Sequence, residues 1–226
     1  IEPERVVQFV TRYLGKSDAP VYEFDGVKYD PVTITALILL KMKSYAEEQG
    51  HDVRDVVISC PVYYGYEERN AIKQAGTIAG LNVLSIINTT TAVTLYYLSD
   101  GEMEEDKRIL VYDLGGTTFN LSLLELQLGK QTLKVIKTDG NEQLGGCEWD
   151  ARLFDCLLRK YAYENGLNDS DLDDELRATI AALVEKLKIK LSALERVSCS
   201  VRHSGDRTRL EVTREEFEEL SQDLVH

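Results

Sequence analysis

Val111-Tyr-Asp-Leu-Gly-Gly-Thr-Thr-Phe-Asn120 is the stretch of sequence that decides the fold. An apolar strand, 108–114, brings the carboxylate of Asp113 to a Gly115-Gly116 turn, and 117–127 is predicted to be a strand running back. Glycines at such a turn let backbone amides approach an anion, and the threonine hydroxyls that follow add donors. An acid at a strand end can hold Mg²⁺ through water. The stretch therefore predicts either a phosphate-binding turn or a β-hairpin whose turn merely needs glycine.

Other short segments stand around this stretch in one order: Val56-Val-Ile-Ser-Cys-Pro61, Ala75-Gly-Thr-Ile-Ala-Gly-Leu-Asn-Val-Leu84, Ile86-Ile-Asn88 and Leu144-Gly-Gly146. Together with 113–120 they resemble the ATPase domain of the DnaK-type heat-shock chaperones, members of the actin and hexokinase superfamily. The likeness runs from about Ile1 to His226. It implies an α/β chain with the actin-like (ribonuclease-H-like) ATPase fold, containing parts of two lobes whose mixed sheets are flanked by helices.

The resemblance also implies a division into lobes. Residues 1–100 match a remnant of lobe I, with an outer-subdomain helix and hairpin followed by inner-subdomain strands and helices. Residues 101–226 match lobe II, with an inner sheet at 101–144, an outer subdomain at 145–217 and the start of a return to the inner subdomain at 218–226. The family's ATPase domain is longer at both ends, and the chain begins at Ile1 without methionine. We therefore expect an internal fragment.

The resemblance implies a nucleotide site between the lobes, which binds ATP or ADP with Mg²⁺. Asp113 matches the acid near the metal, which it holds indirectly through water, and Gly115, Gly116, Thr117 and Thr118 match the second phosphate loop. The matching residues on the adenosine side are Gly145, Gly146, Glu185, Lys188 and Ser192.

The resemblance also concerns one face of a predicted helix and two residues that link domains. The spacing of Glu185, Lys188 and Ser192 puts them on one helical face; without the resemblance, Glu185 and Lys188 indicate only a surface ion pair. Pro61 and Arg69 match residues that relay the nucleotide state between domains.

Three catalytic positions differ from the family. Its lysine near the attacking water corresponds to Thr11, a glutamate to Thr89, and the aspartate that closes the phosphate loop to Asn120. These differences remove one cation and two carboxylates from a site that works by positioning and electrostatics. We expect an ATPase in the parent protein and little or no activity from this chain alone, because half of the phosphate cradle is not in it.

The resulting interpretation is a nucleotide-binding fragment of a DnaK-like stress chaperone, in which ATP hydrolysis drives binding and release of unfolded polypeptides. The resemblance implies a J-domain co-chaperone and a nucleotide-exchange factor as partners. Two alternatives stay open. One is a catalytically impaired nucleotide-binding or exchange-factor-like regulatory module, and the other is an interaction scaffold without nucleotide.

Composition excludes several other classes of function. A net charge of −13 argues against a nucleic-acid partner, because such proteins concentrate lysine and arginine. The longest apolar run, 36–40, is too short to span a membrane, and no secretory signal is present, so the expected location is cytoplasmic. The four cysteines form no CxxC pair, and we expect reduced, packed thiols.

Helices and strands are predicted to alternate along the chain. A helix is expected from Pro3 to Gly15, and Asp25-Gly26 predicts a hairpin turn. Pro31 begins a helix that ends near residue 50, with a buried stripe expected at Ile34, Leu37, Ile38, Lys41 and Tyr45. Strands are expected at 56–59, 82–88, 108–114, 117–127, 132–138, 197–203 and 208–212, and helices at 67–79, 91–98, 147–164, 175–192 and from Thr213 onward.

Overall fold

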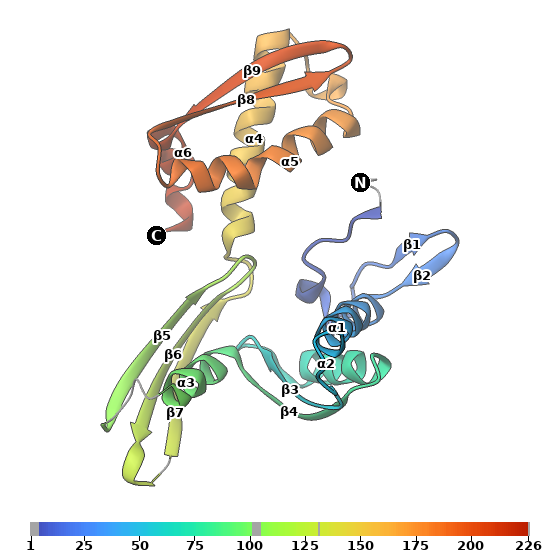
Figure 1. Ribbon diagram of the computed structural model, residues 1–226. Coiled ribbons are helices and arrows are strands. Elements are labelled where there is room, and N and C mark those ends of the chain that lie inside the picture. Colours follow the sequence, from blue (N-terminus) through green and yellow to red (C-terminus); the bar gives the residue numbers. More distant parts are fainter. Residues whose placement is uncertain (1–4, 101–104, 131, 226) are drawn as a thin grey trace. The chain divides into compact units, whose positions relative to one another are not determined.

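The computed structural model describes residues 5–100, 105–130 and 132–225. It divides into two compact units, 1–142 and 143–226, and each is described by itself. The alternation of helices and strands confirms the expected α/β class (Figure 1). Within the described residues, no helix is both long and apolar enough to cross a membrane.

The first unit begins with a shorter helix than the sequence predicts. Within residues 6–15 the structure has the 3₁₀ turn η2 (Val10–Tyr13) and no α-helix, and Pro3 lies outside the described residues. Phe9 has a left-handed backbone (φ 56°), which stops an α-helix from reaching η2 from the N-terminal side. Among the described apolar residues of this segment, Val10 and Leu14 alone are buried, so little packing stabilises a longer helix.

A hairpin and a long helix follow, as expected. β1 (Tyr22–Phe24) and β2 (Val27–Tyr29) pair antiparallel across Asp25-Gly26, and both turn residues have positive φ. Helix α1 (Pro31–Glu48) starts where the Asp30 carboxylate accepts a hydrogen bond from the Thr33 backbone N–H at 2.7 Å.

The buried stripe expected on α1 is wrong. Leu37, Ile38 and Tyr45 are about half exposed, whereas Thr35 and Ala36 are buried. Helix α1 packs against η2 and α2, and small side chains at that contact allow close approach.

A βαβ unit forms the next part of the first unit. β3 (Asp55–Cys60) and β4 (Asn82–Asn88) pair in parallel, and α2 (Tyr66–Ile78) connects them. The buried face of α2 carries Ala71, Ile72 and Ala75. Gly76 lies so close to Val83 that a Cβ would overlap the valine side chain, so this helix and β4 approach through a glycine.

A three-stranded antiparallel sheet completes the first unit. Its order is β5 (Lys107–Leu114), β6 (Phe119–Gln127), β7 (Thr132–Asn141), and α3 (Thr89–Ser99) contacts β5 and β6 (Figure 1). Alternate residues of β6 are buried: Asn120, Ser122, Leu124 and Leu126. The polar end of this row is satisfied by hydrogen bonds, one of them between the hydroxyls of Ser122 and buried Thr90 at 2.7 Å.

The second unit has its own core. Helices α4 (Gly146–Asn165) and α5 (Asp174–Leu191) pack on the hairpin of β8 (Arg196–His203) and β9 (Asp206–Thr213), and α6 (Arg214–Leu220) and the 3₁₀ turn η5 (Gln222–Leu224) follow (Figure 1). The Thr213 hydroxyl accepts from the Glu216 backbone N–H at 3.2 Å, which confirms the expected helix start. The fully buried side chains of this core are Leu153, Leu157, Leu176, Ile180, Leu191, Val201 and Val212.

The cysteines are free thiols, as expected. Cys60 and Cys156 are buried, and Cys147 and Cys199 are partly buried. Burial and the nearby Glu216 carboxylate raise the pKa of Cys156 to about 11. This thiol is therefore neutral at physiological pH and behaves as a small apolar side chain.

Gly15 is needed where η2 meets α2. Its φ is +71°, and an added Cβ would lie 2.6 Å from the Glu68 backbone nitrogen. We expect Gly15→Ala to destabilise the first unit by more than about 2 kcal/mol, because a left-handed strain is added to a backbone clash. Gly50→Ala is the matched control, since Gly50 has φ +87° and open space around it. Equal losses in thermal unfolding, followed by circular dichroism, would contradict the role of close approach.

Candidate functional site

The turn between β5 and β6 places Asp113 directly opposite Asn120 in the strand register. The Asn120 Nδ2 group donates to Asp113 Oδ2 at 3.4 Å and to the Thr118 hydroxyl at 3.3 Å. Its Oδ1 accepts from the Val62 backbone N–H at 3.2 Å. A neutral amide thus holds the Asp113 carboxylate and links this turn to the end of β3.

The two glycines of the turn are not required by its backbone conformation. The Gly115 N–H donates to the Thr118 carbonyl at 2.9 Å, which closes the turn, but neither Gly115 nor Gly116 has positive φ. A Cβ on Gly116 would point into open space, with nothing within 4 Å. A Cβ on Gly115 would lie 3.3 Å from the Thr118 carbonyl oxygen, so the tight turn favours glycine at that position. At Gly116 the hairpin gives no such reason, and there the turn leaves its backbone open to a ligand.

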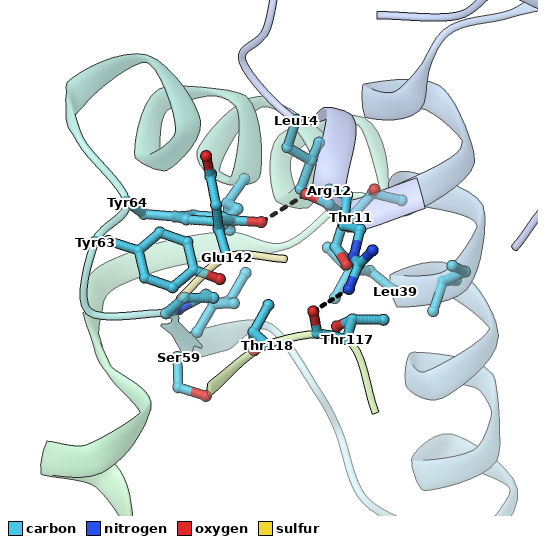
Figure 2. Close-up of a pocket in the computed structure, with 15 residues that line it drawn as sticks. Thr11, Arg12, Leu14, Leu39, Ser59, Tyr63, Tyr64, Thr117, Thr118 and Glu142 are labelled. Carbon is cyan, nitrogen blue, oxygen red and sulfur yellow. Dashed lines mark hydrogen bonds between the residues drawn. The ribbon is translucent and has the colours of Figure 1, made fainter. Parts of the chain in front are cut away.

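A cavity of about 260 Å³ lies beside this turn in the first unit (Figure 2). It brings together four positions singled out in the sequence, Thr11, Pro61, Thr117 and Thr118. The charged and tyrosine residues of the cavity wall that sequence analysis missed are Arg12, Tyr63, Tyr64 and Glu142. The only available signal was adjacency, since Arg12 follows Thr11 and Tyr63 comes two residues after Pro61.

Two hydrogen bonds attach η2 to the rest of the cavity wall. An Arg12 guanidinium Nη2 donates to the Thr117 carbonyl, and the Tyr64 hydroxyl donates to the Thr11 carbonyl at 2.6 Å (Figure 2). Lys16 also forms an ion pair with Glu142 at 3.3 Å. The short 3₁₀ turn is thereby held against the β5–β6 turn, and the Thr11 side chain lines the cavity.

Both tyrosines of the cavity remain protonated at neutral pH. Burial raises the pKa of Tyr63, with the Thr118 side chain acting in the opposite direction. Burial also raises the pKa of Tyr64, and its neighbour Tyr63 adds to the effect. A neutral phenol can donate one hydrogen bond, so the Tyr63 hydroxyl can offer a donor to an oxyanion, whereas the Tyr64 hydroxyl already donates to the Thr11 carbonyl.

Some expected site residues lie outside the cavity wall. Neither Asp113 nor Asn120 is among the described residues that line the cavity. Asn120 nevertheless forms a hydrogen bond with Thr118, which does line it. Thr89 is the first residue of α3 and is half-buried. Arg69 donates through Nε to the Tyr64 carbonyl at 2.8 Å and through Nη2 to Asn88 Oδ1 at 2.6 Å. It therefore connects the Pro61 loop to the residue preceding Thr89.

The second unit contains the remaining expected site residues. Gly145 precedes α4, and its N–H donates to Glu148 Oε2 at 2.7 Å. Lys188 on α5 donates to the Gly146 carbonyl at 2.9 Å and pairs with Asp150 at 2.8 Å.

Lys188 thus joins α4 to α5, and its sequence neighbour Glu185 is not its ion-pair partner. The surface pair between Glu185 and Lys188 is therefore absent from the described contacts. Glu185 is exposed on α5, and Ser192, which directly follows this helix, is also exposed.

Metal ions in proteins are commonly held by clusters of His, Cys, Asp or Glu side chains. No group of three or more His, Cys, Asp or Glu residues within 5–100, 105–130 and 132–225 is arranged to hold a metal ion. A cation near Asp113 would therefore take most of its ligands from water and from ligand oxygens. This coordination is typical of Mg²⁺ in nucleotide sites.

Comparison with known proteins identifies the family of the chain. A family profile described as "Hsp70 protein" matches residues 7–226. The chain is 40% identical to the chaperone protein DnaK of Thermotoga petrophila and of Thermotoga maritima, and 37% identical to that of Thermosipho melanesiensis. Each alignment covers the whole chain, which spans 38% of the length of each relative. The chain therefore belongs to the Hsp70 protein family.

Proposed function

We propose that this chain forms part of the nucleotide-binding region of a DnaK-like chaperone. The open turn beside Asp113 carries the proposal, because Gly116 serves no backbone requirement and leaves the backbone open to a ligand. Family membership supplies the expectation that the ligand is ATP or ADP. The turn, the cavity and the half-buried carboxylate all lie within one unit.

The residues at the turn fit a magnesium-bound phosphate. Asp113 supplies a carboxylate for a metal-bound water, and the Thr118 hydroxyl and the Gly116 backbone N–H supply donors. The Gly115 N–H is already donated to the Thr118 carbonyl. A bound magnesium nucleotide would supply the phosphoanhydride bond to be hydrolysed. Thr11 can orient a water molecule by hydrogen bonding, but its hydroxyl cannot accept the proton of that water at neutral pH. Hydrolysis is therefore slow in this proposal.

The adenosine side is assigned to the second unit in the same proposal. Glu185 on α5 and Ser192 directly after α5 are exposed, and both side chains can form hydrogen bonds with a ribose or adenine ring. The Lys188 ammonium group already bonds the Gly146 carbonyl and the Asp150 carboxylate. Its main contribution would therefore be to fix the start of α4. The glycines at 145 and 146 would then form the floor of this site.

The lobes and partners complete the proposal. Residues 1–100 would belong to lobe I and 101–226 to lobe II, and Pro61 with Arg69 would relay the nucleotide state. Unfolded polypeptides, a J-domain co-chaperone and a nucleotide-exchange factor would act with the full-length protein, in the cytoplasm. The hydrogen bonds from Arg69 to Tyr64 and Asn88 support the relay, because they tie the end of β3 to the end of β4.

Asp113→Asn tests the proposal in the full-length protein. We expect it to abolish the magnesium dependence of ATP affinity while folding is nearly unchanged, because the amide keeps the shape but removes the charge. Asp139→Asn is the control, since Asp139 is exposed on β7 of the same sheet. Calorimetric titration with and without Mg²⁺ gives the affinities. Surviving magnesium dependence together with a large fall in melting temperature would show that Asp113 is only a structural cap.

A further inference from the structure

The β8–β9 hairpin of the second unit has two faces of opposite character. Its inner face carries Val197, Val201, Leu210 and Val212, all buried against the helices. Because strand side chains alternate, the intervening residues point outward. Those exposed outward residues are Arg196, Ser198, Ser200 and Arg202 on β8, and Arg207, Arg209 and Glu211 on β9.

The register brings like charges together on the outward face. Arg202 lies directly opposite Arg207, and Arg209 lies opposite Ser200. Side chains at such positions are about 5 Å apart at Cβ, and like charges there destabilise a sheet. Folding of the hairpin alone therefore does not favour this arrangement.

Most of these arginines have no ion pair with a carboxylate in the described part of the chain. Glu211 pairs with Arg196 at 2.8 Å. Arg207 donates to the Ser200 hydroxyl at 3.1 Å, and Arg209 to the Ser198 hydroxyl at 3.4 Å. No described carboxylate forms an ion pair with Arg202, Arg207 or Arg209. We call these three residues the arginine face.

We propose that the arginine face binds an acidic segment of a partner protein in extended conformation. Arg207 and Arg209 are two residues apart on one strand, a separation of about 7 Å, which equals the spacing of alternate side chains in an extended peptide. Alternate carboxylates of such a peptide can therefore meet successive guanidinium groups in charge-assisted hydrogen bonds. Ser198 and Ser200 lie between the arginines and offer hydroxyls to the same ligand.

The charge of the whole chain favours a peptide over nucleic acid. With a net charge of −13, the protein repels a polyphosphate backbone. The charges of such a backbone extend past the hairpin and would lie over the acidic rest of the surface. A short acidic segment contacts the arginine face alone, and screening limits repulsion from the rest of the surface at about one Debye length, roughly 10 Å at 0.1 M salt.

The test uses the full chain and a fluorescent peptide of alternating glutamate and serine, with binding followed by anisotropy. Arg202→Glu is expected to weaken binding by at least about tenfold. It should not lower the melting temperature, because the new carboxylate faces Arg207. Lys186→Glu is the matched control, since it makes the same charge change at an exposed position of α5. The control should bind the peptide with unchanged affinity.

Several outcomes would overturn the proposal. It is wrong if Arg202→Glu and Lys186→Glu bind the peptide equally, or if an oligonucleotide of the same charge binds more tightly than the peptide. If Arg202→Glu does not fold, Arg202→Gln replaces it, because it removes the charge and keeps a donor. Weaker binding by a folded Arg202→Gln variant supports the proposal, and unchanged binding contradicts it.

Discussion

ATP turnover by the full-length protein is expected to rise by at least about 10²-fold when Thr11→Lys, Thr89→Glu and Asn120→Asp are introduced together. The three changes return one cation and two carboxylates to a site that we propose to act through positioned charge. Charged groups aimed at a transferring phosphoryl group typically contribute about 10²–10³-fold each, and their effects do not add. Single-turnover hydrolysis of ATP measures the change.

The structure predicts how the Asn120 change acts by itself. The Asn120 amide donates to Asp113 across 3.4 Å, so Asn120→Asp replaces a hydrogen bond with two neighbouring carboxylates. Without a cation, repulsion between the two adjacent carboxylates opposes folding. With Mg²⁺ the pair becomes a stronger metal site. The single variant should therefore lose stability in EDTA and regain it when Mg²⁺ is added.

Matched substitutions separate this effect from a general change in charge. Thr132→Lys, Thr77→Glu and Asn168→Asp make the same three replacements at exposed positions, and turnover should stay unchanged. If the restored protein still binds nucleotide but turns over no faster, then a different step limits the reaction or these positions do not face the phosphates. Unchanged turnover would therefore contradict the proposed catalytic roles of Thr11, Thr89 and Asn120.

Ile180→Ala is expected to destabilise the second unit by about 2–5 kcal/mol. The Ile180 side chain is fully buried in the core between α4, α5 and the β8–β9 hairpin. Its truncation removes apolar contacts and leaves a cavity that rigid neighbours fill only in part. Urea unfolding followed by tryptophan fluorescence measures this unit, because Trp149 on α4 is the single tryptophan of the chain.

The same helix provides the control. Ile189 lies on α5 but is 62% exposed, so Ile189→Ala makes the identical truncation with little loss of burial. Its effect should stay within about 0.5 kcal/mol. Similar losses for both variants would show that helix propensity, rather than core packing, determines the stability of α5.

Much of the local structure could be predicted from the sequence. The Asp25-Gly26 hairpin, the start of α1 after Asp30 and the start of α6 after Thr213 are confirmed. Each depends on chemistry within a few residues, such as positive φ at a turn or a side-chain oxygen that accepts an orphan N–H. The resemblance to the DnaK-type chaperones, and with it the actin-like ATPase fold, is also confirmed by the family match over 7–226.

The candidate site could be predicted only in part. Thr11, Pro61, Thr117 and Thr118 do meet at one cavity, although they lie far apart in the chain. Their roles toward nucleotide stay predictions, as do those of the glycines and of Glu185, Lys188 and Ser192. Sequence reasoning missed Arg12, because its importance comes from a hydrogen bond to the Thr117 carbonyl, more than a hundred residues away.

The sequence by itself determined the family, the order of the helices and strands, and the identity of the turn that carries Asp113. Only the tertiary structure decided that η2 is a single turn, that Thr35 and Ala36 rather than Leu37 and Ile38 form the buried side of α1, and that Lys188 bonds the start of α4. The difference has one physical reason. Turns and caps are fixed by nearest neighbours along the chain, whereas burial and hydrogen-bond partners depend on which distant segments reach the same place.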